Sequence, residues 1–260
     1  MLVPFIKMHA QGNDFVVIDF FANDLDVSNF EVLAAAICAR HFGVGADGLV
    51  LMKPTAQADA RMKIYNSDGS CAEMCGSALR CVASLLLKRF RSKTVSILTD
   101  SGLKTATADD ENIKVNLGQA AIVQEDMQVE GFKGDLVDIG NPHFIIFGAD
   151  LDHDPHLKYG AMLEHHPIFP TSVNVHFVKI LDRQNIRIKI WENAVGATLA
   201  CGTGAASTVF AGIQKGLLDN KVRVDLPGGV VNIRYEEQSG DIYLIGPVSE
   251  VFVGKYQWKI

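Results

Sequence analysis

The sequence lacks the features that mark several large classes of protein. No stretch approaches the roughly 18 consecutive apolar residues that a membrane-spanning helix needs, so we expect no membrane span. The first residues lack a basic segment, a long apolar run and a cleavage site, so we expect no secretory signal. Basic residues are not in excess: 24 Lys and Arg against 30 Asp and Glu give a net charge of −6, which argues against a nucleic acid or an anionic membrane as partner.

Cysteine is scarce and odd in number. The chain has 5 cysteines, which suits free thiols in a reducing cytoplasm better than a disulfide framework. We therefore expect a cytoplasmic protein. Its 260 residues, 48% of them hydrophobic, suffice for a sizeable core in one large domain or in two of about 130 residues.

Similar local patterns recur in the same order in the two halves of the chain. Tyr65 and Cys75 are followed 126 positions later by Trp191 and Cys201, each within a similar short segment. Two further matches, near the start and near the end of each half, have an offset of 128. We interpret the pattern as two related halves joined near residues 118–130.

Each half combines strands with helices. Short runs rich in β-branched residues predict strands over 15–19, 49–52, 62–65, 95–98 and 114–117, and over 144–147, 173–180, 186–191, 221–225, 230–235 and 241–244. Apolar segments predict two buried helices, one from Gly76 to about Arg89 and one from Gly202 to about Lys215. A third helix is predicted over Phe30–His41. The predicted fold class is therefore α+β, with two pseudo-symmetric parts.

Cys75 and Cys201 take equivalent places in the two halves. Each follows a strand-like segment and a short loop, precedes a glycine and begins a buried helix. At a helix N-terminus, unpaired N–H groups and the positive end of the helix dipole stabilise a thiolate, and the same N–H groups can bind a carboxylate. If the halves face each other, one sulfur can remove the proton on Cα of an amino acid while the other returns a proton to the opposite face. Such an inversion needs no cofactor, and we predict none.

Other interpretations of these and nearby residues are weaker. Cys38 and Cys81, and with less support Cys71, are interpreted as structural thiols. Cys71 and Cys75 are close enough in sequence to share a zinc ion, but no fourth ligand is evident, so we predict no metal site. Residues 43–48 have G-x-G-x-x-G spacing, but they follow a helix and lead into a strand, which is the reverse of a dinucleotide-binding motif.

A series of short motifs runs along the whole chain. They are Lys7–Phe15, Arg40–Gly48, Asn66–Ser70, Met74–Gly76, Gly140–His143, Phe169–Asn174, Thr198–Ala205 and Leu226–Gly229. In these motifs the chain resembles the diaminopimelate epimerase family, whose members work without pyridoxal phosphate. The resemblance implies an isomerase that acts on a small amino-acid substrate, with two domains that are each a β-barrel-like sheet wrapped around a central helix. It implies domains over 1–118 and 119–247, with segment 248–260 returning to the first domain, and a homodimer by analogy.

The resemblance also implies roles for single residues. Cys75 and Cys201 match the two catalytic cysteines, and His143 and Glu192 match residues that poise those thiols. Amides that bind polar groups of the substrate are matched by Asn13, Asn66, Asn141 and Asn174. The segments whose backbone holds the substrate carboxylate are matched by Gly76 with Ser77, and by Gly202 with Thr203.

Four positions depart from the family pattern. Asn193, which we still expect near the substrate, replaces the arginine that anchors the distal carboxylate of diaminopimelate. The other replacements are Ser77 for an asparagine, His176 for a glycine and Ala197 for a glutamate. Removing one partner of a buried charge pair typically costs about 2–5 kcal/mol. The substrate is therefore diaminopimelate or another free amino acid, basic or neutral, such as histidine.

Two further alternatives stay open at the level of sequence. Proline racemases and phenazine-biosynthesis isomerases share the expected architecture but match the motifs less well. A thiol-based redox or binding protein would need Cys75 and Cys201 to act as a cross-linking pair. Deuterium from the solvent enters Cα during turnover by an isomerase and does not do so in a redox protein.

Overall fold

The structure is a computed structural model that describes residues 1–258. The chain divides into two compact units. Unit 1 begins at Met1, ends at Val115 and also takes in the C-terminal segment from Pro247 onward. Unit 2 comprises Asn116–Gly246.

Unit 1 is a mixed sheet with two helices. Its strands are β1 (Leu2–Ala10), β2 (Asn13–Asp19), β3 (Gly48–Lys53), β4 (Ala60–Asn66), β5 (Cys71–Ala72), β6 (Thr94–Thr99), β7 (Gly102–Asp109), β18 (Ser249–Gln257) and most of β8 (Asn112–Gly118). Its helices are α1 (Phe30–Cys38) and α2 (Gly76–Phe90). The strands pair in the order β18, β1, β2, β3, β4, β6, β7, β8, and β5 adds to β4.

Unit 2 repeats this plan. Its strands are β9 (Ala121–Val129), β10 (Phe132–Asp138), β11 (Pro142–Phe147), β12 (Asn174–Asp182), β13 (Asn185–Glu192), β14 (Gly196–Ala197), β15 (Lys221–Leu226), β16 (Gly229–Glu236) and β17 (Asp241–Gly246). Its helices are α3 (Pro155–Glu164) and α4 (Gly202–Gln214). The strands pair in the order β9, β10, β11, β12, β13, β15, β16, β17, and β14 adds to β13.

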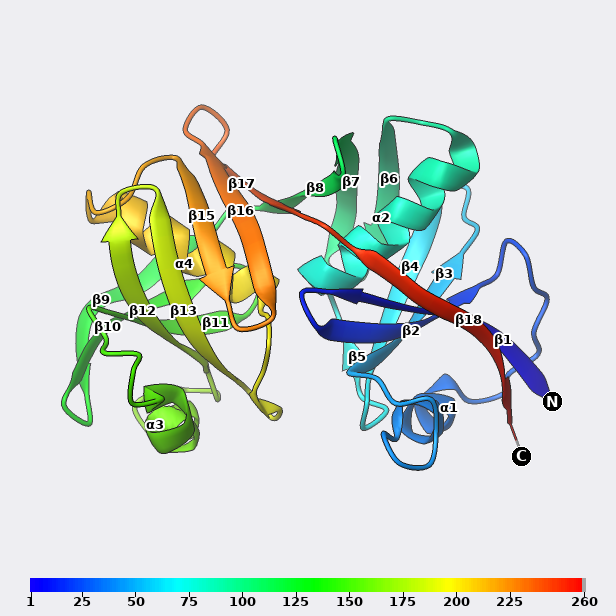
Figure 1. Cartoon of the computed structure of the whole chain (residues 1–260), viewed down its shortest axis with the longest axis horizontal. Coiled ribbons are helices and arrows are strands. Elements are labelled where there is room, and N and C mark those ends of the chain that lie inside the picture. Colours follow the sequence, from blue (N-terminus) through cyan, green and yellow to red (C-terminus); the bar gives the residue numbers. More distant parts are fainter. Residues whose placement is uncertain (259–260) are drawn as a thin grey trace. The chain divides into compact units, whose positions relative to one another are not determined.

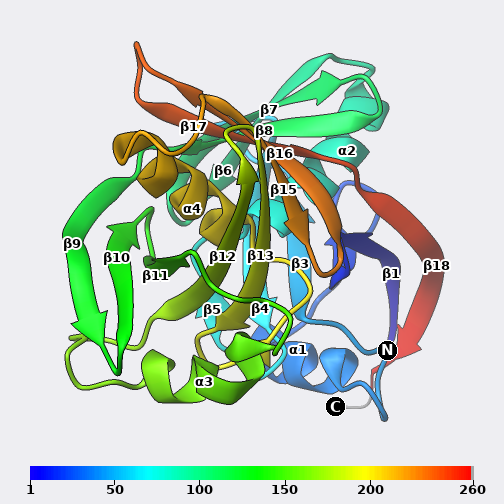
Figure 2. The same cartoon turned by 60° about the vertical axis from the view of Figure 1, so that its left-hand side comes forward.

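The two sheets share their pattern of strand directions. In each, the third and fourth strands are parallel, as are the fifth and sixth, and the other pairs in the order are antiparallel. Both parallel steps are bridged by a helix, α1 and α2 in unit 1 and α3 and α4 in unit 2. The first place in the order is filled by β18 from the C-terminal end of the chain in unit 1 and by β9 in unit 2. Figures 1 and 2 both show β18 running beside β1.

A buried helix forms the centre of each unit (Figure 1). Helix α2 packs against β1, β2, β4, β6 and β7, and α4 packs against β10, β11, β12, β16 and β17. The first nine residues of α2 are buried, as are ten of the thirteen residues of α4. A second apolar cluster in each unit joins the sheet to the shorter helix, α1 or α3. The α+β class and the two helix-centred sheets predicted from the sequence are confirmed.

One predicted helix boundary was wrong, and several elements were not predicted. The helix predicted to reach His41 ends at Cys38, because Ala39 leaves the helical region with ψ 115° and its carbonyl binds Gly43 N–H instead. Strands β1, β5, β7, β9, β10, β14 and β18 and helix α3 were not predicted. Within residues 1–258, no helix combines the length and apolar character that a membrane span would require.

Gly160 lies in the middle of α3, where the ring of Trp191 passes directly over it. A Cβ atom at this position would lie 2.4 Å from the indole ring. Glycine normally weakens a helix by about 1 kcal/mol relative to alanine. The close approach of Trp191 therefore explains why this weak helix former stands inside α3, and also why the helix is hard to predict.

We expect Gly160→Ala to destabilise the protein despite its higher helix propensity. The added methyl group must displace Trp191, and overpacking of this kind costs roughly 1–3 kcal/mol. Urea unfolding followed by circular dichroism measures the change. Lys158→Ala, at an exposed position in the same helix, is the matched control and should be nearly neutral. An unchanged or raised midpoint for Gly160→Ala would show that Trp191 does not limit this position.

Candidate active site

Cys75 is the N-cap residue of α2. Its backbone is extended, with φ −144° and ψ 120°, and no side chain caps the first N–H groups of the helix. The half-buried Cys75 thiol lies 3.9 Å from the Nδ2 atom of Asn13, a distance suited to an N–H donor and sulfur. Gly76 and Ser77 form the first turn, and the buried Ser77 Oγ has no hydrogen-bond partner within residues 1–258. The sulfur thus has one amide donor beside it and lies at the positive end of the α2 dipole.

Asn13 owes its place to a tight hairpin between β1 and β2. Gln11 and Gly12 both have positive φ, 51° and 82°, and Ala10 pairs directly with Asn13. This is the backbone twist that two-residue hairpins prefer. Asp14, the next residue, is tied to Lys7 and Arg40 by ion pairs, which fix the start of β2.

Arg80 is a buried cation inside α2 that the sequence analysis did not identify. Its side chain is 1% exposed, and Nη2 donates to Oε1 of Gln11 at 2.5 Å. Within the described part of the chain, Nε and Nη1 of Arg80 have no hydrogen-bond partner. Burial lowers the pKa of Arg80 to about 10, while the charges of Cys81 and Cys75 act in the opposite direction. A guanidinium held next to Cys75 in this way favours the anionic form of that sulfur.

Cys201 is the N-cap residue of α4 and has the same extended backbone, with φ −128° and ψ 109°. Its sulfur, however, turns back onto its own helix. It accepts a hydrogen bond from Gly204 N–H at 3.4 Å and lies 3.6 Å from Thr203 Oγ1. Cys201 is only 4% exposed. Gly202 and Thr203 form the first turn of α4.

The surroundings of Cys201 favour its protonated form. Burial is the main cause that raises the pKa of this thiol well above its ordinary value, and the carboxylate of Glu192 raises it further. Thr203 and the N–H of Gly204 oppose this shift without cancelling it. Glu192 in turn accepts a hydrogen bond from Thr198 Oγ1. Cys201 is therefore a thiol near neutral pH.

Two buried histidines lie beside Cys201. His143 Nδ1 and His176 Nε2 are 2.9 Å apart, and one ring nitrogen of each histidine and the Cys201 sulfur all lie within 4.8 Å of one another. Asn141 Oδ1 lies 3.0 Å from His143 Nε2 and can only accept a hydrogen bond, so it favours the His143 tautomer with a proton on Nε2. His143 Nδ1 then accepts from His176 Nε2–H. Burial is the main cause that lowers both pKa values, that of His176 to about 3, so both rings are neutral.

The side-chain amide of Asn174 makes two hydrogen bonds to the backbone of unit 2. Its Nδ2 donates to the Pro142 carbonyl at 3.0 Å, and its Oδ1 accepts from Asn193 N–H at 3.1 Å. The side chain of Asn193 is exposed. In unit 1, Asn66 is exposed and donates to Ser70 Oγ at 2.9 Å. Asn174 thus fixes the turn after β13, and Asn66 closes a turn after β4.

Glu164 is a second buried charge that the sequence analysis did not identify. Its Oε2 accepts from Trp191 Nε1 at 2.8 Å, and its Oε1 accepts from Ala194 N–H at 2.7 Å. Ala194 has a positive φ of 61°. The carboxylate at the end of α3 therefore holds the turn that carries Glu192 and Asn193 in a conformation that non-glycine residues rarely adopt.

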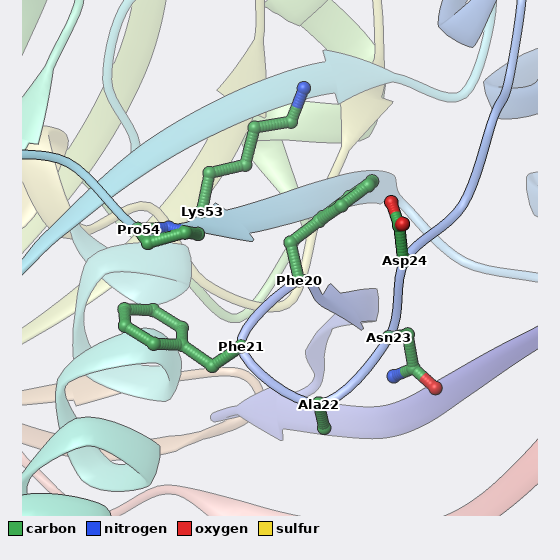
Figure 3. A pocket seen from close by; sticks show the side chains of 7 residues that line it. All are labelled: Phe20, Phe21, Ala22, Asn23, Asp24, Lys53 and Pro54. Atoms are coloured by element: carbon green, nitrogen blue, oxygen red, sulfur yellow. The ribbon is translucent and has the colours of Figure 1, made fainter.

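Two further features of unit 1 are the G-x-G-x-x-G segment, whose Asp47 hydrogen-bonds to Asp14, and a surface pocket. Residues 43–48 connect α1 to β3, as the sequence analysis predicted, and Gly43 is needed because a Cβ atom would lie 2.3 Å from the Ala36 carbonyl. Figure 3 shows a surface pocket of about 580 Å³ lined by Phe20, Phe21, Ala22, Asn23, Asp24, Lys53 and Pro54. Its lysine Nζ lies 4.8 Å from the centroid of the Phe20 ring. None of the predicted site residues lines this pocket.

The predicted site residues thus form one group in each unit. Asn13, Gly76 and Ser77 gather around Cys75. His143, Glu192, Gly202 and Thr203 gather around Cys201, and Asn141 joins them through His143. Asn174 and Asn193 belong to the turn after β13. Asn66 lies in the turn after β4, where it donates to Ser70 Oγ. His176, identified from sequence only as a departure, contacts His143, and its ring would lie 2.0 Å from a Cβ atom on Gly204.

The fold is that of racemases and epimerases. A hydroxyproline epimerase from Agrobacterium vitis superposes with a TM-score of 0.71 at 15% identity, covering 98% of this chain and 92% of that one. A phenazine biosynthesis protein of the PhzF family from Bacillus anthracis gives a TM-score of 0.74 at 14% identity, covering 98% and 99%.

Sequence relatives make the assignment narrower. The family model of diaminopimelate epimerase matches residues 5–123 and 136–251. The diaminopimelate epimerases of Desulforudis audaxviator and Carboxydothermus hydrogenoformans are both 40% identical to this chain, covering 98% of it and 99% of their own length. The chain belongs to the diaminopimelate epimerase family, and the protein is an isomerase of the epimerase and racemase type, as the sequence motifs predict.

We expect Glu192→Gln to make Cys201 more reactive toward alkylation. Removing the carboxylate charge lowers the pKa of the thiol, because Glu192 raises it. A lower pKa raises the fraction of thiolate, which is the form that iodoacetamide alkylates. The rate of iodoacetamide labelling of the Cys201 peptide at pH 8, followed by mass spectrometry, measures the effect. Glu237→Gln, at an exposed position of the same unit, is the control, and an unchanged Cys201 rate in Glu192→Gln would contradict the assigned influence.

Proposed function

We propose that the protein inverts Cα of a free amino acid by using Cys75 and Cys201 as its two proton-transferring groups. The observation that carries this proposal is their common position. Each sulfur sits at the N-cap of the central helix of its unit, and the two units share one strand order. A reaction that needs one proton donor and one acceptor on opposite faces of a carbon atom requires such a pair.

The surroundings of the two sulfurs support different protonation states before the reaction begins. Cys75, beside Asn13 and the Arg80 cation, is the thiolate that removes the Cα proton. Cys201, buried beside Glu192, is the thiol that gives its proton to the opposite face. After one inversion Cys75 is a thiol and Cys201 a thiolate, which is the state that the reverse reaction starts from. His143 and Glu192 are positioning residues in this scheme, since they act on Cys201.

The N–H groups in the first turns of the two helices suit the carboxylate of the substrate. The first turn of α2 has no side-chain cap, and Gly76 and Ser77 present its N–H groups. Gly202 and Thr203 occupy the same place in α4. Donors that face the carboxylate also stabilise the negative charge that develops on it when Cα loses its proton.

Replacing either cysteine should abolish inversion. We expect Cys75→Ala and Cys201→Ala each to lower the rate by about 10²-fold or more, because each variant lacks one of the two transfer groups. Product chirality and deuterium at Cα are measured after incubation in deuterated water. Cys71→Ala, an exposed thiol of unit 1, is the control and should keep its activity. A nearly normal rate in either active-site variant would exclude the two-thiol mechanism.

Diaminopimelate is the first candidate substrate, because relatives of 35–40% identity carry that name. The turn after β13 favours a second candidate, an amino acid without a distal carboxylate, such as histidine. Asn193 is exposed and neutral at the position expected to meet the substrate side chain. It offers no charge to a second carboxylate.

A panel of substrates tests the second candidate. We expect a basic or neutral L-amino acid to give a higher kcat/KM than LL-diaminopimelate in the native enzyme. Asn193→Arg should raise kcat/KM for diaminopimelate, because a guanidinium supplies the positive charge and the pair of parallel N–H donors that a carboxylate binds. Asn193→Gln, which keeps an amide, is the matched control. If the native enzyme turns over diaminopimelate efficiently and no other amino acid in the panel, the second candidate is excluded and diaminopimelate is the substrate.

A further inference from the structure

His143, His176 and Cys201 form a compact group of donor atoms in unit 2. Their side chains come from two neighbouring parallel strands, β11 and β12, and from the start of α4. All three are buried, with exposures of 0%, 0% and 4%. Two imidazoles and a thiolate are the donor types that zinc and similar divalent ions prefer.

The spacing of these donors is close to what a tetrahedral ion needs. With metal–nitrogen bonds of about 2.0–2.1 Å and metal–sulfur bonds of about 2.3 Å, neighbouring donors lie roughly 3.3–3.6 Å apart. The two histidine nitrogens are 2.9 Å apart, and the sulfur lies within 4.8 Å of both. An increase of roughly 0.5 Å in the nitrogen–nitrogen distance, and a decrease of up to about 1.3 Å in the sulfur–nitrogen distances, would bring all three atoms into the first coordination sphere of one ion.

The hydrogen bonds around the group support this use. Metal-binding histidines usually donate their second N–H to a carbonyl or carboxylate oxygen, which fixes the ring. Asn141 Oδ1 accepts from His143 Nε2 in this way, so that Nδ1 presents a lone pair. His176 Nδ1 is buried and has no hydrogen-bond partner among residues 1–258. The Glu192 carboxylate beside Cys201 supplies a second negative charge that would balance a dication.

We propose that His143, His176 and Cys201 bind a zinc-like divalent cation, and that the bound ion blocks Cys201. Binding joins the metal to the sulfur and releases the thiol proton to the solvent. His143 contributes the Nδ1 lone pair, and His176 contributes the Nε2 lone pair after its ring proton moves from Nε2 to Nδ1, so both rings stay neutral. No electron is transferred. The consequence for catalysis rests on the proposed function, because a metal-bound Cys201 has no proton to give. Removal of the ion restores the thiol.

Cobalt absorbance tests the site without any need for turnover. Chelator-treated protein is titrated with Co²⁺ in the absence of oxygen. We expect one ion per chain, a thiolate-to-cobalt charge-transfer band, the strong visible bands of four-coordinate cobalt, and about one proton released per ion at pH 8. Cys201→Ser should lose the charge-transfer band. His176→Phe, which keeps an aromatic ring over Gly204, should weaken Co²⁺ binding at least about tenfold.

Cys75→Ser is the matched control, since it removes the equivalent thiol of unit 1 and should keep the whole spectrum. Circular dichroism of each variant verifies that it is folded, and Cys201→Ser decides the matter if His176→Phe does not fold. Absence of the charge-transfer band in the native protein, or its survival in Cys201→Ser, would overturn the proposal. An enzyme that is active but binds no Co²⁺ would refute the metal site alone, and one that binds Co²⁺ but inverts no amino acid would refute the proposed function alone.

Where activity is found, Zn²⁺ should inhibit the native enzyme and EDTA should restore it. The inhibition is compared as the ratio of rates with and without Zn²⁺. We expect this ratio to move toward one in His176→Phe, whatever its own rate. Equal sensitivity in both proteins would show that zinc acts elsewhere.

Discussion

The feature on which the site depends is a cysteine at the N-cap of a helix that is buried inside a sheet. A helix in the middle of a unit cannot shift, because strands pack against it along its length. Its first N–H groups have no partners within the helix and must meet a side chain or a ligand. The sheet therefore fixes the position of the sulfur. The unpaired N–H groups of the first helical turn fix part of its surroundings. This constraint is met twice, by α2 in unit 1 and by α4 in unit 2.

The two sulfurs share a backbone position but differ in their surroundings. Around Cys75 the structure places an amide donor and a buried cation. Around Cys201 it places a carboxylate, two neutral histidines and a nearly complete cover of protein. The first set favours a thiolate and the second a thiol, so the repeated fold holds a pair of unequal groups. An inversion with one base and one acid needs this inequality. The two neutral imidazoles beside Cys201 also give unit 2 a group of three potential metal donors.

The sequence predicted the central helix and the middle strands of each unit. It did not predict the first two strands in the order of either sheet. The 126-position repeat identified equivalent strands, and the structure pairs Tyr65 with Leu49 and Trp191 with Val175 at corresponding places in the two sheets. Strand β1 escaped because Pro4 interrupts its pattern; Pro4 is tolerated since its partner is Lys255 on β18, and pairing with β2 starts only at Ile6. Helix α3 was not predicted because its central residue, Gly160, is a weak helix former that stands there to accommodate the ring of Trp191.

The missed site residues share a physical reason. Arg80, Glu164 and His176 act through burial and through partners far away in sequence, and no local spacing reveals such partners. The sequence signal for Arg80 was a lone cation in an apolar helix, and for His176 a bulky ring at a position where the family has glycine. The donors around Cys201 come from positions 143, 176 and 192, which only the pairing of β11, β12 and β13 brings together.

The central claim is that the two N-cap sulfurs carry different charges in the resting enzyme. Proteins labelled with ¹³C at cysteine Cβ, in the native form and as the Cys75→Ser and Cys201→Ser variants, allow each sulfur to be titrated separately by NMR. The account predicts that Cys75 ionises at a lower pH than Cys201 and that the Cys201 signal is still that of a thiol at pH 8. A Cys201 signal that is already that of a thiolate at neutral pH, or one that titrates together with Cys75, would contradict it.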